Sequence, residues 1–66
     1  MRYEIWRNTV SFIDNENRYV GEIGYRHCFG KIIFYVAGKV ETEYVEKIAE
    51  MLPEISRRIR MLERRV

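Results

Sequence analysis

Cysteine, proline and histidine each occur only once in this chain of 66 residues, and glutamine is absent. With Cys28 as the single cysteine, neither an intrachain disulfide nor a cysteine-based metal cluster can form. His27 has no second histidine or cysteine at ligand spacing, which argues against a zinc site within one chain. We therefore predict no metal and no cofactor, and we expect so small a domain to gain stability from a partner chain.

Long apolar runs are also missing. No segment approaches the roughly 18 apolar residues that a membrane span requires. The first four residues, Met1 to Glu4, lack the apolar stretch of a signal peptide. We expect a soluble, cytoplasmic protein without a membrane partner, and the scarcity of amide side chains beside many Glu and Arg favours a thermophilic source.

Residue types that carry catalysis are scarce. His27 and Cys28 are the only candidates for a thiolate and its base, but neighbours on an extended segment point to opposite faces. Asp14 is the only aspartate, and Ser11 and Ser56 are the only serines, so a Ser-His-Asp triad would need almost every available residue. The glycines lack the spacing of a dinucleotide fingerprint or a phosphate loop. We predict that the protein is not an enzyme.

The composition that is present indicates one folded domain over residues 1–66. Residues 1–40 are rich in aromatic and β-branched types and predict an antiparallel sheet. We expect three strands, with turns between them, at about 3–13, 18–25 and 29–37. In the first of these, Trp6, Val10 and Phe12 share one face, and the mixed phase indicates a bulge near Arg7 and Asn8.

Residues 42–66 have helical periodicity, with Thr42 as the expected N-cap after a turn at residues 37–39. Apolar residues recur in steps of three and four, which is a heptad seam. The seam consists of Val45, Ile48, Leu52, Ile55, Ile59, Leu62 and Val66. Pro53 lies off the seam and predicts a kink or a break. The predicted fold is therefore α+β: a three-stranded antiparallel sheet followed by one long C-terminal helix kinked at Pro53.

A helix of this length is longer than strands of six to eight residues, so its second half is expected to project past the sheet. The projecting apolar stripe would be buried by another chain, which predicts a homodimer or higher homo-oligomer through the seam residues. Residues 41–54 carry five Glu and one Lys, and residues 55–66 carry five Arg and one Glu. This gradient suits an antiparallel two-fold helix pair, but complementation of the helix dipole explains it equally well. A further alternative is that Pro53 folds the second half back onto the sheet.

Two binding functions remain open at this point. The first is nucleic-acid association through arginine and tyrosine, because a cluster of arginines ends the helix and the sheet half mixes cations with aromatic rings. The candidate contacts are Arg57, Arg58, Arg60, Arg64 and Arg65 on the helix, with Lys31 and Tyr35 on the sheet. The second is an assembly subunit whose helix pairs with itself or with another chain, which would leave those arginines paired with glutamates of the partner helix.

Overall fold

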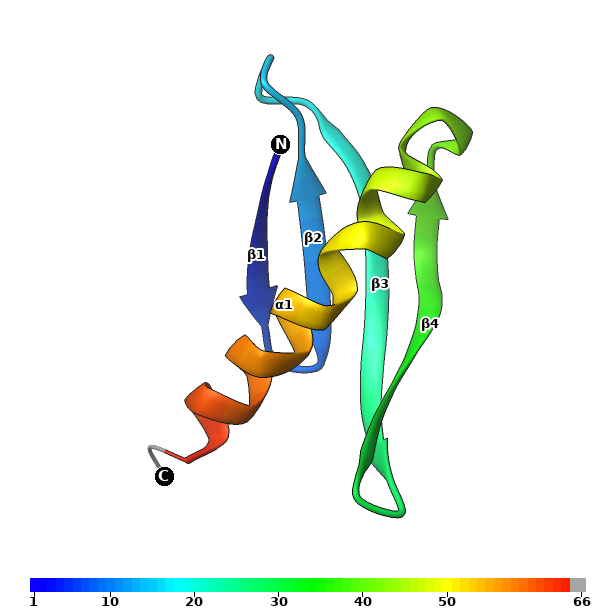
Figure 1. Ribbon diagram of the computed structural model, residues 1–66. Helices are drawn as coiled ribbons and strands as arrows, with labels where there is room; N and C mark the ends of the chain where they lie inside the picture. Colours follow the sequence, from blue (N-terminus) through cyan, green and yellow to red (C-terminus); the bar gives the residue numbers. More distant parts are fainter. Residues whose placement is uncertain (65–66) are drawn as a thin grey trace.

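The computed structural model describes residues 1–64 and shows an α+β fold in which an antiparallel sheet precedes a C-terminal helix. The sheet has four strands, so the prediction of three was wrong, and they lie in the order β1-β2-β3-β4. The helix crosses one face of the sheet diagonally, from the end of β4 towards β1 (Figure 1). The elements are β1 (Arg2–Trp6), β2 (Thr9–Ile13), β3 (Tyr19–Cys28), β4 (Lys31–Val40), the 3-10 turn η1 (Thr42–Tyr44) and α1 (Val45–Glu63).

The extra strand arises at Arg7 and Asn8. These two residues form a tight turn, in which Arg7 adopts a positive φ of 56°, and the strand expected over 3–13 becomes the hairpin of β1 and β2. Across it Ile5 pairs with Val10, so both side chains point to the helix. The mixed phase of the sequence therefore marks a turn and not a bulge, and Trp6 lies on the face opposite to Val10.

The hairpin of β3 and β4 has Phe29 and Gly30 at its tip, with φ values of 52° and 78°. Two positive φ angles in a two-residue loop are the signature of a type I′ turn. The turn expected at residues 37–39 lies instead within β4. The pairing register with β3 shifts there, because Ile23 pairs with Val36 whereas Gly21 pairs with Val40. Residues 37–39 thus form a bulge, and β4 continues to Val40 before the chain enters η1.

Asp14 organises the turn between β2 and β3. Its buried carboxylate accepts hydrogen bonds from the backbone amides of Glu16 and Arg18 at 2.9 and 2.8 Å. The Arg18 guanidinium and the Tyr44 hydroxyl also donate to it, at 3.1 and 3.3 Å. The hydrogen bond from the Arg18 amide is the main reason that the pKa of Asp14 lies below its ordinary value. Asp14 is a structural residue that ties this turn to η1.

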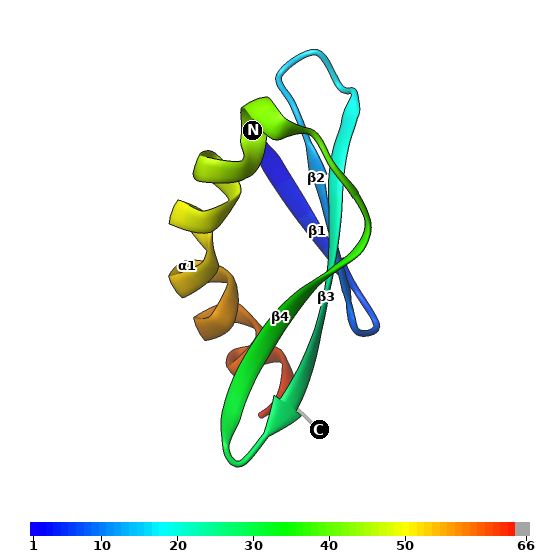
Figure 2. The same ribbon diagram turned by 90° about the vertical axis from the view of Figure 1, so that its right-hand side faces the viewer.

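The core lies between the sheet and α1, as the edge-on view shows (Figure 2). It is formed by Val10, Phe12, Val20, Ile23, Tyr25, Ile48, Ile55 and Ile59. Ile55 and Ile59 have 0% and 1% exposure within the single chain, so the expectation that they project past the sheet was wrong. That expectation compared helix length with strand length, whereas a diagonal helix spans the width of the sheet as well.

The heptad seam is therefore used largely inside the chain. Ile48 is buried in the core with Ile55 and Ile59, and these three residues cannot serve an oligomer interface as predicted. Val45 and Leu62 remain exposed and Leu52 is half-buried, so for them the interface stays a prediction. The predicted interface residue Val66 and the predicted nucleic-acid contact Arg65 lie outside the described residues.

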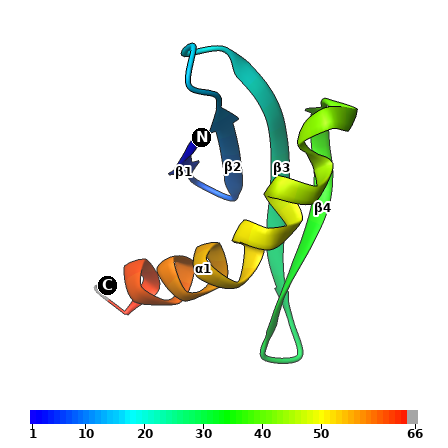
Figure 3. The same cartoon turned by 45° about the horizontal axis from the view of Figure 1, so that its top comes forward.

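Pro53 lies inside α1 without ending it, on the exposed side of the helix. Of the two outcomes predicted from Pro53, a break does not occur, because α1 is continuous from Val45 to Glu63 (Figure 3), and the kink stays a prediction. The expected N-cap at Thr42 was wrong, because Thr42 begins η1 and Tyr44 occupies the N-cap position of α1. Among residues 1–64, no helix combines the length and the apolar character needed to cross a bilayer.

Candidate nucleic-acid interface

No element of residues 1–64 covers the face of the sheet that points away from α1 (Figure 2). We call this the open face. Strand alternation assigns its residues, because they lie between the buried positions of each strand. They include Arg2, Glu4, Trp6, Thr9, Ser11, Ile13, Tyr19, Glu22, Gly24, Arg26, Cys28, Lys31, Ile33 and Tyr35.

One cross-strand row of the open face has an aromatic residue at each end. Trp6 pairs with Thr9, Thr9 with Gly24, and Gly24 with Tyr35. Trp6 is 72% exposed and Tyr35 is 48% exposed. Three strand spacings separate them, which is about 14 Å. The Tyr35 ring lies over Gly24, so of the two residues between Trp6 and Tyr35 only Thr9 is not covered by that ring.

Three cationic side chains lie on one side of this row. The guanidinium carbon of Arg7 lies 5.5 Å from the centre of the Trp6 ring, within cation–π distance. Arg26 and Lys31 follow along the sheet, opposite Ile33 and Cys28, and within residues 1–64 neither has an ion pair. We call Trp6, Arg7, Arg26, Lys31 and Tyr35 the open-face patch.

Acidic residues of the open face lie on the other side of the aromatic row. Glu4 and Glu22 pair with Ser11 in the next row, and Glu22 raises the pKa of Tyr19, adding to the effect of burial. Arg2, one row further, donates to the Asn17 amide oxygen at 2.6 Å. The open face is therefore polarised along the strands, with its unpaired positive charge near the tip of the β3–β4 hairpin.

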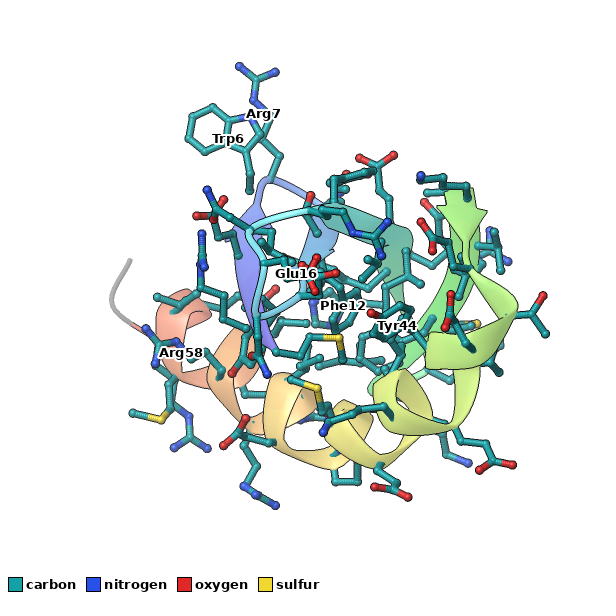
Figure 4. All side chains as sticks on the ribbon, turned by 90° about the horizontal axis from the view of Figure 1, so that it is seen from above. Trp6, Arg7, Phe12, Glu16, Tyr44 and Arg58 are labelled. Atoms are coloured by element: carbon teal, nitrogen blue, oxygen red, sulfur yellow. The ribbon has the colours of Figure 1, made fainter. Side chains whose placement is uncertain are left out.

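The view from above separates two residues of this patch, Trp6 and Arg7, from the helix (Figure 4). Trp6 and Arg7 point away from α1, whereas Phe12 and Tyr44 lie between the sheet and the helix. Buried Tyr25 braces the turn from the helix side, because its hydroxyl donates to the Arg7 carbonyl at 2.8 Å. The turn that presents Trp6 and Arg7 is thus fixed by the core.

The predicted helix arginines lie in the helix layer, on the opposite side of the sheet from the open face. Arg57, Arg58, Arg60 and Arg64 are exposed on α1 or at its C-cap, and Figure 4 shows Arg58 on the helix side. The structure therefore does not bring them together with Lys31 and Tyr35, which lie on the open face.

One of these helix arginines makes a side-chain hydrogen bond within the chain. Arg60 donates to the Gly30 carbonyl at 3.3 Å, which ties α1 to the β3–β4 turn. Arg58 faces Tyr3, whose pKa is raised by burial and by the nearby Glu54 carboxylate. Arg57, Arg58 and Arg64 make no side-chain hydrogen bond or ion pair within the described part of the chain.

Trp6 is the site residue that the sequence prediction missed, since it was assigned to one face with Val10 and Phe12. The signal was the Arg7-Asn8 pair, because Asn readily adopts turn conformations and a two-residue turn reverses the face assignment of the preceding strand. Arg7 and Arg26 belong to the cations of the sheet half, and the sequence prediction did not name them as contacts.

His27 and Cys28 occupy successive strand positions and point to opposite faces. His27 instead contacts the Glu63 carboxylate, with its Nε2 at 2.6 Å, near the end of α1. Residues 1–64 contain no cluster of three or more His, Cys, Asp or Glu side chains arranged to hold a metal ion.

Comparison with protein-family models, with curated proteins and with solved structures finds no match to this chain.

Proposed function

We propose that the protein is a small non-enzymatic module that binds single-stranded nucleic acid on the open face of its sheet. The observation that carries the proposal is the exposed Trp6 ring, which lies under the Arg7 guanidinium and in one row with Tyr35. A soluble domain leaves so large an aromatic ring in water less often than it buries it. Bases stacked on Trp6 and Tyr35 would give that exposure a role.

The chemistry of the patch favours single strands over duplexes. Unpaired bases can lie flat on aromatic rings, whereas the bases of a duplex are already stacked on one another. The Tyr35 ring covers Gly24, and Trp6 lies at the other end of the same row, so the row offers two aromatic surfaces to successive bases. Arg7, Arg26 and Lys31 lie beside it and would contact phosphates, with the arginines able to bind two phosphate oxygens at once.

The test is a titration with short single-stranded DNA and RNA at low and moderate salt. Trp6 is the only tryptophan, so its fluorescence reports directly on the proposed site, and the anisotropy of a labelled oligonucleotide gives an independent affinity. We expect quenching of Trp6 and an affinity that falls with salt, with a slope that corresponds to about three phosphate contacts. No binding at low salt would refute the proposal.

Variants identify the surface. We expect Trp6→Ala to weaken binding by about 10- to 100-fold, through loss of one stacked base. Lys31→Ala should lower the salt slope by about one. Lys47→Ala, an exposed cation on the first half of α1, is the matched control and should change neither. If Arg57→Ala with Arg64→Ala abolishes binding while Trp6→Ala does not, the helix surface binds and the open-face proposal is wrong.

The assembly function remains the alternative. It requires that α1 pairs with another helix. The described seam residues that are not fully buried in the core, and so could contact that helix, are Val45, Leu52 and Leu62. Mass measurements on Leu62→Lys would test it, because a helix-paired dimer would dissociate when a charge enters the seam.

A further inference from the structure

β4 lies at the edge of the sheet but has the sequence of an interior strand. Residues 32–36 are five consecutive apolar residues, Ile-Ile-Phe-Tyr-Val, with no charge on either face. Such continuous apolar runs are typical of strands with neighbours on both sides and cover on both faces. Natural edge strands usually carry charges that discourage pairing with another chain.

The opposite edge provides the comparison within the same molecule. β1 alternates apolar Tyr3 and Ile5 with charged Arg2 and Glu4, so its open-face side is protected by charge. β4 has no such protection between Lys31 and Lys39. The two edges of one sheet thus differ in the property that decides whether a strand can accept a partner.

Both faces of β4 leave apolar surface in water. Val36, on the helix side, is 66% exposed, and Ile33 and Tyr35 are exposed on the open face. Beside Val36 a shallow groove of about 250 Å³ runs between β4 and the first half of α1. It is lined by apolar residues that include Phe34, Val40, Val45 and Leu52.

The charges near the two ends of β4 are opposite in sign. Lys31 begins the strand, and Arg60 is held close to it by its hydrogen bond to the Gly30 carbonyl. Beyond the other end lie Glu41, which pairs with Lys39 at 3.3 Å, and Glu43, which has no ion pair in residues 1–64. In an antiparallel pair the Lys31 end of each copy points towards the Glu43 end of the other, whereas a parallel pair would place Lys31 beside Lys31.

We propose that a second copy of this chain pairs with β4 edge to edge, in an antiparallel, two-fold arrangement. The regular part of the strand, residues 31–36, makes the ladder, because the bulge at 37–39 interrupts the edge beyond it. Two-fold symmetry keeps both helices on one side and gives a continuous eight-stranded sheet. The inner side chains of the partner's strand then lie across the mouth of the apolar groove.

This pairing is independent of nucleic-acid binding but changes the shape of the open face. The two copies of Tyr35 would lie near the two-fold axis, and the two copies of Trp6 at the outer edges of the joined sheet. A single chain offers one aromatic row, and the pair would offer two rows in one surface.

Sedimentation of the full chain over a concentration series tests the pairing. We expect a species of twice the 8.1 kDa chain mass that dissociates on dilution. Val36→Lys should weaken the dimer at least about 100-fold, because it places a charge in the joined apolar surface. Met61→Lys is the matched control: Met61 is 61% exposed, close to the 66% of Val36, and lies near the far end of α1. It should leave the dimer intact.

Hydrogen exchange of the unmodified protein gives a second test that needs no variant. In a monomer, alternate amides of both edge strands point to water and exchange fast. In the proposed dimer every amide from 31 to 36 is protected, while β1 keeps its alternating pattern.

Three results would overturn the proposal. They are a monomer at about 500 µM, a concentration at which even a weak dimer is populated, a dimer unaffected by Val36→Lys, and alternating exchange along β4 in a sample shown to be dimeric. A dimer that Leu62→Lys dissociates and Val36→Lys does not would assign the interface to the helix instead.

Discussion

The ring of Tyr35 lies over Gly24 on the neighbouring strand, so closely that a Cβ atom on residue 24 would come within 2.5 Å of a ring carbon. Gly24 has no positive φ, so its backbone does not need glycine. What the glycine supplies is space, and the ring occupies that space on the open face.

Gly24→Ala should displace the ring without much loss of stability. The atoms that a Cβ would meet belong to the far end of the Tyr35 side chain, which can swing into solvent, so we expect the free energy of unfolding to change by less than about 1 kcal/mol. The ring protons of Tyr35 should shift in NMR spectra. Gly21→Ala is the contrast, because its Cβ would meet Ile48 at 3.2 Å in the core and should cost about 1–3 kcal/mol. Equal costs for both variants would contradict this assignment.

Phe29→Asn should stabilise the protein. Phe29 is fully exposed and has a φ of 52°, a conformation that asparagine adopts more readily, and Asn-Gly is the preferred pair in a type I′ turn. We expect the free energy of unfolding in urea to rise by about 0.5–1 kcal/mol. Phe29→Ala removes the same ring without that preference, so an alanine variant as stable as the asparagine variant would show that the turn is not the cause.

Ile59→Asp should unfold the chain. Ile59 is buried against the sheet within one chain, and an unpaired carboxylate there costs more than about 3 kcal/mol, a large part of the stability of so small a domain. Circular dichroism should show loss of the helical signal. The heptad interpretation predicts instead a folded monomer, so a folded Ile59→Asp variant of reduced mass would restore it.

Asp14 should make stability depend on acid pH. Its folded-state pKa lies below the ordinary 3.8, so the carboxylate contributes stability that is present above about pH 4 and is lost as the pH falls through the folded-state pKa. Asp14→Asn should lower the melting temperature at neutral pH by about 5–10 °C and flatten its fall in acid. Glu16→Gln is the control in the same turn. Only the backbone amide of Glu16 takes part in the hydrogen-bond network, so loss of its carboxylate should change neither the melting temperature nor its fall in acid. An unchanged acid dependence in Asp14→Asn would contradict this role.

The sequence predicted the fold class, which follows from period and composition, whereas α1 begins at Val45, after the 3-10 turn η1. It did not predict four strands. The turn at Arg7 and Asn8 contains no glycine, and its left-handed residue is Arg7, whereas the residue type that signals a turn is Asn8. The missed turn also reversed the face of Trp6, which is why the sequence prediction placed this exposed ring on one face with Val10 and Phe12.

The helix shows a different limit of prediction. Periodicity identified the apolar positions of α1, but it reports that a face is buried and not what buries it. Ile55 and Ile59 pack on the chain's own sheet because α1 runs diagonally, and crossing angle is a property of packing that no spacing encodes. The predicted contacts Lys31 and Tyr35 share the open face for a reason that is readable in sequence, the two-residue alternation of a strand.

The order of the strands in the sheet also sets how the chain reaches its fold. Each strand lies beside its neighbour in the sequence, so the three ladders close through short loops and incur little loop entropy. The helix is the exception, since Ile55 and Ile59 must find strands at the other end of the chain. We therefore expect docking of α1 to be a late step of folding, after the hairpins that carry Trp6 and Tyr35 have formed.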